Sequence, residues 1–134
     1  MQKYRAYHTV LGWADPKNIS LFGDGTGRVD YPGTSCSLTN PCLHLKRVAN
    51  KTDRRGVVVW EGAVLKFRGS ADIFYIIEWA DNKWRIRWDW KTAETRKQKT
   101  LGLIPGNISN IMEIMGDCHE KPELMKLIEE TPDE

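Results

Sequence analysis

The fold is decided by the sequence FYIIEWADNKWRIRWDW, which spans Phe74–Trp90. Its second half alternates strictly between apolar and charged side chains. One face of an extended chain carries Trp84, Ile86, Trp88 and Trp90, and the other face carries Arg85, Arg87, Asp89 and Lys91. A period of two is typical of a strand with one buried and one solvated face. We therefore predict a strand over residues 84–90.

A two-residue turn at Asp81-Asn82 joins this strand to the apolar run before it, because Asp and Asn adopt positive φ more readily than most residues. The turn fixes the register of an antiparallel hairpin. The facing pairs are Trp79 with Trp84, Ile77 with Ile86, Tyr75 with Trp88, Ile73 with Trp90 and, on the solvated face, Glu78 with Arg85. Each pair joins apolar to apolar or acid to base, so a shift by one residue would break all of them.

Length and composition indicate an ordinary globular protein with a single domain over residues 1–134. Hydrophobic residues make up 40% of the chain, and the formal net charge of +2 does not by itself demand a nucleic-acid partner. Three cysteines, an odd number, argue against a disulfide framework and favour a reducing compartment. No apolar run approaches the roughly 18 residues of a membrane span, and no signal sequence is visible. We expect a cytoplasmic protein with no membrane partner.

The segments before the hairpin have mainly β character. A first strand lies within residues 3–13, and the turn-rich segment 12–42 is predicted to be an irregular arm or insertion. Short strands are expected in this arm around Ile19–Phe22 and Arg28–Tyr31. The barrel core, predicted for residues 43–116, contains strands at Leu43–Val48, Val57–Trp60, Ala63–Phe67 and Ile111–Met115.

Two segments after the hairpin have different character. Residues 92–106 are polar and basic without a clean period, so we predict a loop there. Pro122 suits the first position of a helix, which we predict for residues 122–130.

Three segments, in this order, resemble the YopX family of phage and prophage proteins. The family carries a lysine- and aspartate-rich turn followed by a strand pair, which residues 51–67 match. It continues with a strand that ends in Glu-Trp before a turn, matched by Tyr75–Trp79, and closes with a strand, a glycine and a short Pro-Glu-Leu helix, matched by Glu113–Leu124. The resemblance covers roughly residues 43–128.

The resemblance implies an SH3-like β-barrel core. Together with the arm and the helix predicted from the residues, the expected fold is mainly β: an SH3-like, partly open barrel with an irregular N-terminal β arm, which the family motifs do not match, and a short C-terminal helix. The resemblance also implies a bacteriophage or prophage gene product that acts in the bacterial host cell and forms a homo-oligomer. It implies no reaction.

A basic strip is the main candidate binding site. Its members are Arg85, Arg87, Lys91, Arg96, Lys97 and Lys99. Guanidinium groups bind phosphate bidentately and Trp stacks on bases, so the strip suits an anionic ligand that carries a ring. Two more residues complete the predicted ligand-binding set: Trp60, which the hairpin register leaves unassigned, and Arg28, the charge that follows a glycine-rich loop. A solvated strand face that protects a sheet edge explains the strip equally well.

Other candidate sites have weaker sequence support. Gly23–Arg28 resembles a phosphate cradle, but a hairpin tip is the simpler reading. Cys36, Cys42 and His44 suggest zinc, yet their spacing is wrong for a zinc knuckle and a fourth ligand would have to come from Cys118 or His119. Glu78 is better explained as an ion-pair partner than as a general acid. We therefore expect no metal, no cofactor and no catalysis.

Two functions remain open. The first is a non-catalytic phage accessory protein that binds a nucleotide signal or nucleic acid through the basic strip, in phage–host counter-defence. The second is an inhibitor that docks on a host defence protein, for example of the CRISPR type, through the arm at residues 12–42. A hydrolase is a third and weaker alternative, because the sequence shows no set of catalytic acid, base and nucleophile that hydrolysis requires.

Overall fold

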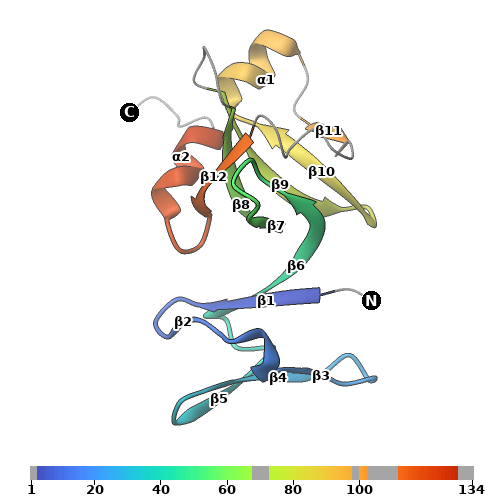
Figure 1. Cartoon of the computed structure of the whole chain (residues 1–134), viewed down its shortest axis with the longest axis vertical. Coiled ribbons are helices and arrows are strands. Elements are labelled where there is room, and N and C mark those ends of the chain that lie inside the picture. Colours follow the sequence, from blue (N-terminus) through green and yellow to red (C-terminus); the bar gives the residue numbers. More distant parts are fainter. Residues whose placement is uncertain (1–2, 68–72, 98–99, 103–111, 130–134) are drawn as a thin grey trace. The chain divides into compact units, whose positions relative to one another are not determined.

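The computed structural model describes residues 3–67, 73–97, 100–102 and 112–129. These residues form two compact units, Met1–Val48 and Ala49–Glu134. Figure 1 labels the elements along the chain. The predicted single domain over residues 1–134 stays a prediction.

The first unit is built from short antiparallel strands. In chain order they are β1 (Lys3–His8), β2 (Gly12–Trp13), the 3-10 turn η1 (Pro16–Asn18), β3 (Ile19–Leu21), β4 (Gly27–Tyr31), β5 (Thr34–Ser37) and β6 (Leu43–Thr52), which continues into the second unit. Strand β1 pairs with β2 on one side and β6 on the other, and β4 lies between β3 and β5. The predicted strands around Ile19–Phe22 and Arg28–Tyr31 are confirmed. The arm is more regular than predicted, since β5 adds a third strand.

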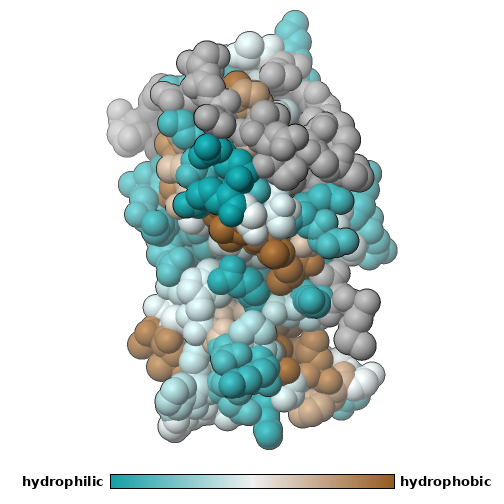
Figure 2. All heavy atoms as spheres, in the orientation of Figure 1, coloured by the Kyte–Doolittle hydropathy of each residue, from teal (hydrophilic) through white to brown (hydrophobic). Residues whose placement is uncertain are grey.

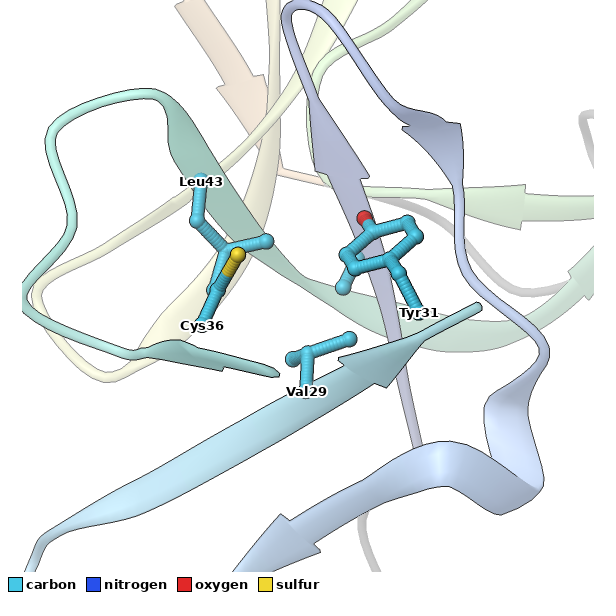
Figure 3. Packing of buried hydrophobic residues seen from close by; sticks show 5 residues of the cluster. Val29, Tyr31, Cys36 and Leu43 are labelled. Carbon is cyan, nitrogen blue, oxygen red and sulfur yellow. The ribbon is translucent and has the colours of Figure 1, made fainter. Parts of the chain in front are cut away.

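A small apolar core holds the first unit together. Its buried members are Ala6, Val29, Tyr31, Cys36 and Leu43, four of which are labelled in Figure 3. Strand alternation brings Val29 and Tyr31 to the same side of β4, and the hydroxyl of Tyr31 donates to the carbonyl of Gly12 at 2.9 Å. The Pro32-Gly33 turn that leads into β5 uses a positive φ of 81° at Gly33, as a type II turn requires.

The second unit contains a curled five-stranded sheet. Its elements are β7 (Val58–Trp60), β8 (Ala63–Phe67), β9 (Phe74–Ala80), β10 (Lys83–Trp88), α1 (Trp90–Arg96), β11 (Thr100–Gly102), β12 (Met112–Asp117), the 3-10 turn η2 (Pro122–Leu124) and α2 (Met125–Ile128). The sheet order is β11-β10-β9-β8-β12, and every pairing is antiparallel. The predicted fold class is confirmed as a mainly β, partly open barrel with a short C-terminal helix.

Both faces of this sheet carry buried residues. On one face Leu65, Tyr75 and Trp88 lie in register across three strands, and Ile77 faces Ile86 beside them; all five are buried. On the other face Val64 faces Ile76, and both pack against Ile128 of α2. The helix predicted for residues 122–130 is therefore present, although it begins as a 3-10 turn and the structure assigns it only to Ile128. Residue 130 lies outside the described residues.

Two predictions after the hairpin are wrong. Residues 92–106 are not one long loop, because α1 occupies Trp90–Arg96 and β11 occupies Thr100–Gly102. The predicted pairing of Ile73 with Trp90 is absent, because β10 ends at Trp88 and Trp90 begins the helix. The carboxylate of Asp89 causes the switch, since it accepts the N–H of Thr92 at 2.7 Å and so caps α1.

Candidate functional site

The β9–β10 hairpin positions the arginines of the predicted basic strip. Its register agrees with the prediction at Trp79–Trp84, Glu78–Arg85, Ile77–Ile86 and Tyr75–Trp88. Asp81 and Asn82 form the turn with φ values of 54° and 59°, the left-handed conformation that the prediction required. Because side chains alternate along a strand, Arg85 and Arg87 share the face opposite Ile86 and Trp88.

Glu78 lies between the two arginines and fixes both. Its Oε1 accepts from Nε of Arg85 at 3.0 Å, and its Oε2 accepts from Nε of Arg87 at 2.8 Å. The two arginine side chains are 31% and 29% exposed and that of Glu78 is 21% exposed. The interpretation of Glu78 as a sheet ion-pair partner is confirmed. Two guanidinium groups and one carboxylate leave a local charge of +1.

The ends of the two arginines differ in their surroundings. Nη1 of Arg87 lies 3.9 Å from Oε1 of Glu129, just after α2. Within the described residues Arg85 has only its Nε contact to Glu78, so its two terminal amino groups point to no protein acceptor. Arg85 is therefore the more open of the two anion-binding groups.

Helix α1 continues the basic strip beyond β10. Lys91 is exposed, and its Nζ lies 5.5 Å from the ring centroid of the half-buried Trp90. Lys97 ends the helix in a left-handed conformation with φ of 55° and is also exposed. Arg96 is the last residue of α1, and Lys99 lies outside the described residues. The fold thus places Arg85, Arg87, Lys91 and Lys97 on one continuous strand–helix segment.

Two residues of the predicted ligand-binding set lie elsewhere. Arg28 belongs to β4 of the first unit, where its Nε is 3.5 Å from Oδ1 of Asp30. Trp60 is buried in β7, and its Nε1 donates to Oδ1 of Asp117 at 2.7 Å. A buried indole offers no ring face on which a base could stack, so Trp60 serves the fold of the second unit.

The hairpin tryptophans are less uniformly buried than the alternation predicted. Trp88 is buried and meets Tyr75 edge to face, with ring centroids 5.7 Å apart. Trp79 and Trp84 are half-buried and form a second edge-to-face pair at 5.3 Å near the turn. Trp90 is half-buried on α1 and not on the strand face at all.

Residues 23–26 lie in the tip of the β3–β4 hairpin, as the simpler interpretation predicted, and Gly27 and Arg28 already belong to β4. Asp24 accepts from both Oγ1 and the backbone N–H of Thr26, and these hydrogen bonds lower the pKa of Asp24 below its ordinary value. An ionised carboxylate inside the loop repels a phosphate group. This arrangement therefore disfavours the alternative of a phosphate cradle.

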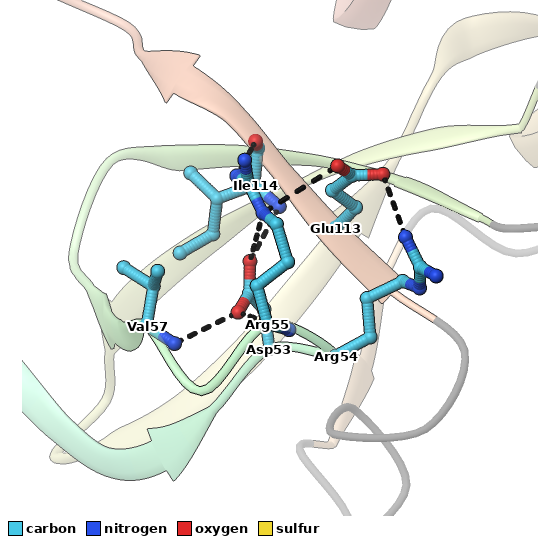
Figure 4. A network of polar contacts seen from close by, with 6 residues as sticks. All are labelled: Asp53, Arg54, Arg55, Val57, Glu113 and Ile114. Atoms are coloured by element: carbon cyan, nitrogen blue, oxygen red, sulfur yellow. Dashed lines mark hydrogen bonds and ion pairs between the residues drawn. The ribbon is translucent and has the colours of Figure 1, made fainter.

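Sequence reasoning missed three buried carboxylates in the second unit: Asp53, Asp117 and also Asp89, which the alternation wrongly placed on the solvated face of the strand. Asp53 accepts from the backbone N–H groups of Arg55 and Val57 at 2.9 Å and of Ile114 at 3.1 Å, as Figure 4 shows. Asp117 accepts from Trp60 and from two backbone N–H groups of the following turn. The signal for Asp53 was present, because Asp three residues before Gly56 is typical of a side-chain-stabilised turn.

The cysteines do not form the zinc site that the alternative reading considered. Cys36, Cys42 and Cys118 are all free thiols. Within the described residues a single group of three metal-binding side chains lies close together, and it contains neither Cys36 nor Cys42. In the same part of the chain, no helix is long and apolar enough to cross a membrane.

Comparison with solved structures identifies the fold. YopX from Bacillus subtilis superposes with a TM-score of 0.58 at 16% sequence identity, over 91% of this chain and 96% of that chain. The chain has a YopX-like fold. Protein EF1440 from Enterococcus faecalis shares it, with a TM-score of 0.55 at 21% identity over 93% of this chain and 98% of that chain.

The predicted resemblance to YopX is confirmed for the fold, and each comparison covers more than nine tenths of this chain. No family model matches the sequence, and no curated protein matches it. At these identities the likeness bears on the fold alone.

Proposed function

We propose that this protein is a non-catalytic binding protein that holds an anionic, ring-bearing ligand on the β10–α1 segment. Single-stranded nucleic acid is the ligand class we favour, with a nucleotide signal as its smaller equivalent. The observation that carries the proposal is the pair Arg85 and Arg87, which Glu78 fixes through their Nε atoms.

Preorganisation supports the arginine pair as a phosphate-binding group. An arginine in solution loses side-chain entropy when it binds, whereas a guanidinium already fixed through Nε loses less. The terminal amino groups of Arg85 have no acceptor within the described residues and suit two oxygens of one phosphate. Glu129 also lies near Arg87, so Arg85, whose terminal amino groups face no protein acceptor within the described residues, is the stronger anion-binding group of the pair.

The charge and ring content of the following helix support the same ligand. Residues 83–97 hold six Lys or Arg against two acids, and one of these acids, Asp89, is buried as the cap of α1. The solvent-facing side of the segment is therefore more basic than its composition indicates. Trp90 lies half-exposed between these cations, where base stacking contributes about 1–3 kcal/mol per base in single-strand binders.

Fluorescence anisotropy with a labelled single-stranded oligonucleotide, at a low and a physiological salt concentration, tests the proposal. The double variant Arg85→Ala/Arg87→Ala is expected to weaken binding by roughly tenfold or more and to lower the salt slope by about two, because two phosphate contacts are lost. Thermal-shift measurements with a panel of nucleotides test the smaller ligand, a nucleotide signal.

The matched control is Lys17→Ala/Lys126→Ala, which removes two exposed lysines from outside the strip. Both double variants take the formal net charge from +2 to 0, so the change in total charge is the same in both. Equal weakening by the two variants, or no binding of the unmodified protein at low salt, would contradict the proposal.

A second candidate function, docking on another protein, is supported by the apolar tip of the β3–β4 hairpin. Leu21 and Phe22 are 45% and 52% exposed, and brown, apolar atoms reach the surface of the first unit in Figure 2. Exposed apolar side chains on a loop suit a contact with a partner protein. On this proposal the partner is a host defence protein.

Pull-down from a bacterial lysate with the unmodified protein and with Leu21→Ser/Phe22→Ser tests this candidate. Deleting residues 12–42 would be a poorer test, because it removes Val29, Tyr31 and Cys36 from the core of the first unit. A partner lost only in the double variant supports docking, and equal recovery of all partners counts against it.

The biological setting of both candidates is also a proposal. We place the protein in the cytoplasm of a bacterial host cell, as a phage or prophage product that counters host defence. A homo-oligomer is part of the same proposal.

A further inference from the structure

Three consecutive residues at the end of β12 bring three kinds of metal-binding atom together. A carboxylate oxygen of Asp117, Sγ of Cys118 and a ring nitrogen of His119 all lie within 4.8 Å of one another. Asp117 is buried, Cys118 is half-buried and His119 is exposed, so the group opens towards solvent on one side. The proposed anion site does not use this group, and the structural contacts of Asp117 do not account for the approach of Cys118 Sγ to the ring of His119.

Several contacts hold the backbone of this turn in place. The carboxylate of Asp117 accepts the N–H groups of His119 at 2.7 Å and Glu120 at 3.1 Å, and Nε1 of Trp60 from β7 at 2.7 Å. The N–H of Cys118 donates to the carbonyl of Gly62 at 2.9 Å. The three side chains therefore project from a turn that is held by contacts to β7 and to Gly62, just after β7.

The separation between sulfur and nitrogen matches the demands of a tetrahedral metal ion. Sγ of Cys118 lies 3.5 Å from Nδ1 of His119. A zinc ion with ordinary Zn–S and Zn–N bonds at the tetrahedral angle sets these two atoms about 3.5 Å apart. The carboxylate oxygen lies within 4.8 Å of both atoms, so a tetrahedral ion requires the three side chains to draw closer together on binding.

The chemistry of the donors selects the class of metal. Thiolate and imidazole ligands favour zinc and similar transition metals and disfavour magnesium and calcium, which prefer oxygen ligands alone. A thiolate, a carboxylate and a neutral imidazole carry two negative charges, which balance a divalent ion. The hydrogen bonds on Asp117 correspond to the outer contacts that usually orient a ligating carboxylate.

We propose that Asp117, Cys118 and His119 bind one divalent transition-metal ion of the zinc class, with a fourth position open to water or to another ligand. The ion fastens the end of β12 to the turn that leads into η2 and α2. The spacing of Cys36 and Cys42 predicts no metal site, and the three consecutive residues 117–119 have no zinc-finger spacing either.

Titration of the metal-free protein with Co²⁺ alone, followed by displacement with Zn²⁺, tests the proposal. A tetrahedral site that contains a thiolate gives intense visible d–d bands and a sulfur-to-cobalt charge-transfer band. We expect both to saturate at one Co²⁺ per chain and to disappear when Zn²⁺ is added. Thermal unfolding in the presence of Zn²⁺ is expected to shift to higher temperature, because the ion binds the folded state.

The cysteines of the chain provide a matched control. Cys118→Ser and His119→Ala are each expected to abolish the charge-transfer band or to weaken Co²⁺ binding at least tenfold, whereas Cys42→Ser, at another half-buried thiol, leaves both unchanged. His119 is exposed, so its replacement does not endanger folding. The proposal is overturned by the absence of a charge-transfer band in the unmodified protein, by its survival in Cys118→Ser, or by its loss in Cys42→Ser.

Discussion

Buried aspartates connect turns to distant strands in the second unit. Asp53, Asp89 and Asp117 are each 3% exposed or less, and each accepts backbone N–H groups. Around Asp53, Nε of Arg55 lies 3.6 Å from the carboxylate, and Nη2 of Arg55 donates to the carbonyl of Ile114 at 3.0 Å. Burying a carboxylate costs free energy unless such partners replace water. Each of these aspartates therefore depends on the groups that donate to it.

Replacement of Asp53 by Asn is expected to lower the free energy of unfolding by about 2–3 kcal/mol. The amide presents an N–H₂ group towards a backbone N–H, either at Ile114 or in the turn, so a buried donor loses its acceptor. Urea unfolding measures the change. Asp30→Asn, on half-exposed β4, is the control and is expected to stay within about 0.5 kcal/mol. Equal effects of the two substitutions would show that the network around Asp53 adds no stability.

The same carboxylate predicts a dependence of stability on pH. Burial would raise the pKa of Asp53, but hydrogen bonds from the N–H groups of Ile114, Val57 and Arg55, together with the charge of Arg55, outweigh burial and hold the pKa below its ordinary value of 3.8. A carboxyl with a lowered folded pKa stabilises the protein above its unfolded pKa, and this contribution is lost as pH falls through the folded pKa.

The difference in free energy of unfolding between the unmodified protein and Asp53→Asn is therefore expected to be constant near neutral pH and to shrink below pH 3.8. Urea unfolding at a series of pH values, on both proteins, measures it. A difference that stays constant through the acid range would contradict the lowered pKa.

At the scale of single elements, the β9–β10 hairpin depends on its two-residue turn. Both Asp81 and Asn82 adopt the left-handed conformation, which costs most residues roughly 1–2 kcal/mol and costs glycine nothing. Because the register sets every facing pair, the turn also decides which side chains share a face with Glu78.

Asn82→Val is expected to destabilise the protein by about 1–2 kcal/mol, since a β-branched side chain opposes positive φ, whereas Asn82→Gly is expected to be neutral or stabilising. Thermal unfolding of the two variants measures the contrast. Lys83→Val, at the next and exposed position in β10, controls for the side chain itself and is expected to change little. If Asn82→Val and Asn82→Gly have the same stability, Asn82 does not adopt the left-handed conformation in the folded protein.

The junction between β10 and α1 depends on Asp89. Its Oδ1 caps the helix at Thr92, and its Oδ2 accepts the N–H of Phe74 at 2.8 Å, from the start of β9. Asp89→Ala is expected to cost about 2–3 kcal/mol, because the cap is lost and the N–H of Phe74 has no acceptor in its place.

Circular dichroism and urea unfolding measure the loss at Asp89. Thr95→Ala, on the exposed side of the same helix, is the comparison and is expected to change the stability by less than about 0.5 kcal/mol. A loss in Asp89→Ala no larger than in Thr95→Ala would mean that α1 does not depend on its cap.

At the scale of the whole molecule, the chain has two units, each with its own apolar core. Val29 is fully buried in the first, and Val64 is fully buried in the second. Because the cores are separate, a substitution in the core of one unit is expected to lower the stability of mainly that unit.

Val29→Ala is expected to lower the stability of the first unit by roughly 2 kcal/mol, which corresponds to about thirtyfold faster exchange of its protected amides. Hydrogen exchange read by mass spectrometry should show this loss in β4 and β5 and not in β8 and β9. Val64→Ala should give the reverse pattern. An equal loss of protection in both units would mean that they unfold as one.

Charge is also organised at the scale of the molecule. Residues 83–99 carry seven basic side chains against two acids, and residues 113–134 carry eight acids against two lysines. The contact between Arg87 and Glu129 joins these segments within one chain. At least one basic side chain of the first segment is therefore paired with an acid of the second within the same chain, while residues 130–134 lie outside the described part of the chain.

The strand periods and turn residues were enough to predict the β9–β10 register, the Glu78–Arg85 pair and the mainly β fold, because alternation and turn conformation are local properties that each segment carries by itself. The end of β10 could not be predicted in this way. Trp90 continues the alternation perfectly, and yet the chain turns into a helix there. The cause is the carboxylate of Asp89, which accepts the N–H of Phe74, fifteen residues earlier. Likewise Asp117 meets Trp60 across 57 residues, and Arg87 meets Glu129. Such contacts exist only once distant strands are adjacent, so the fold, and not the local pattern, decides which polar residues are buried partners and which remain open to a ligand.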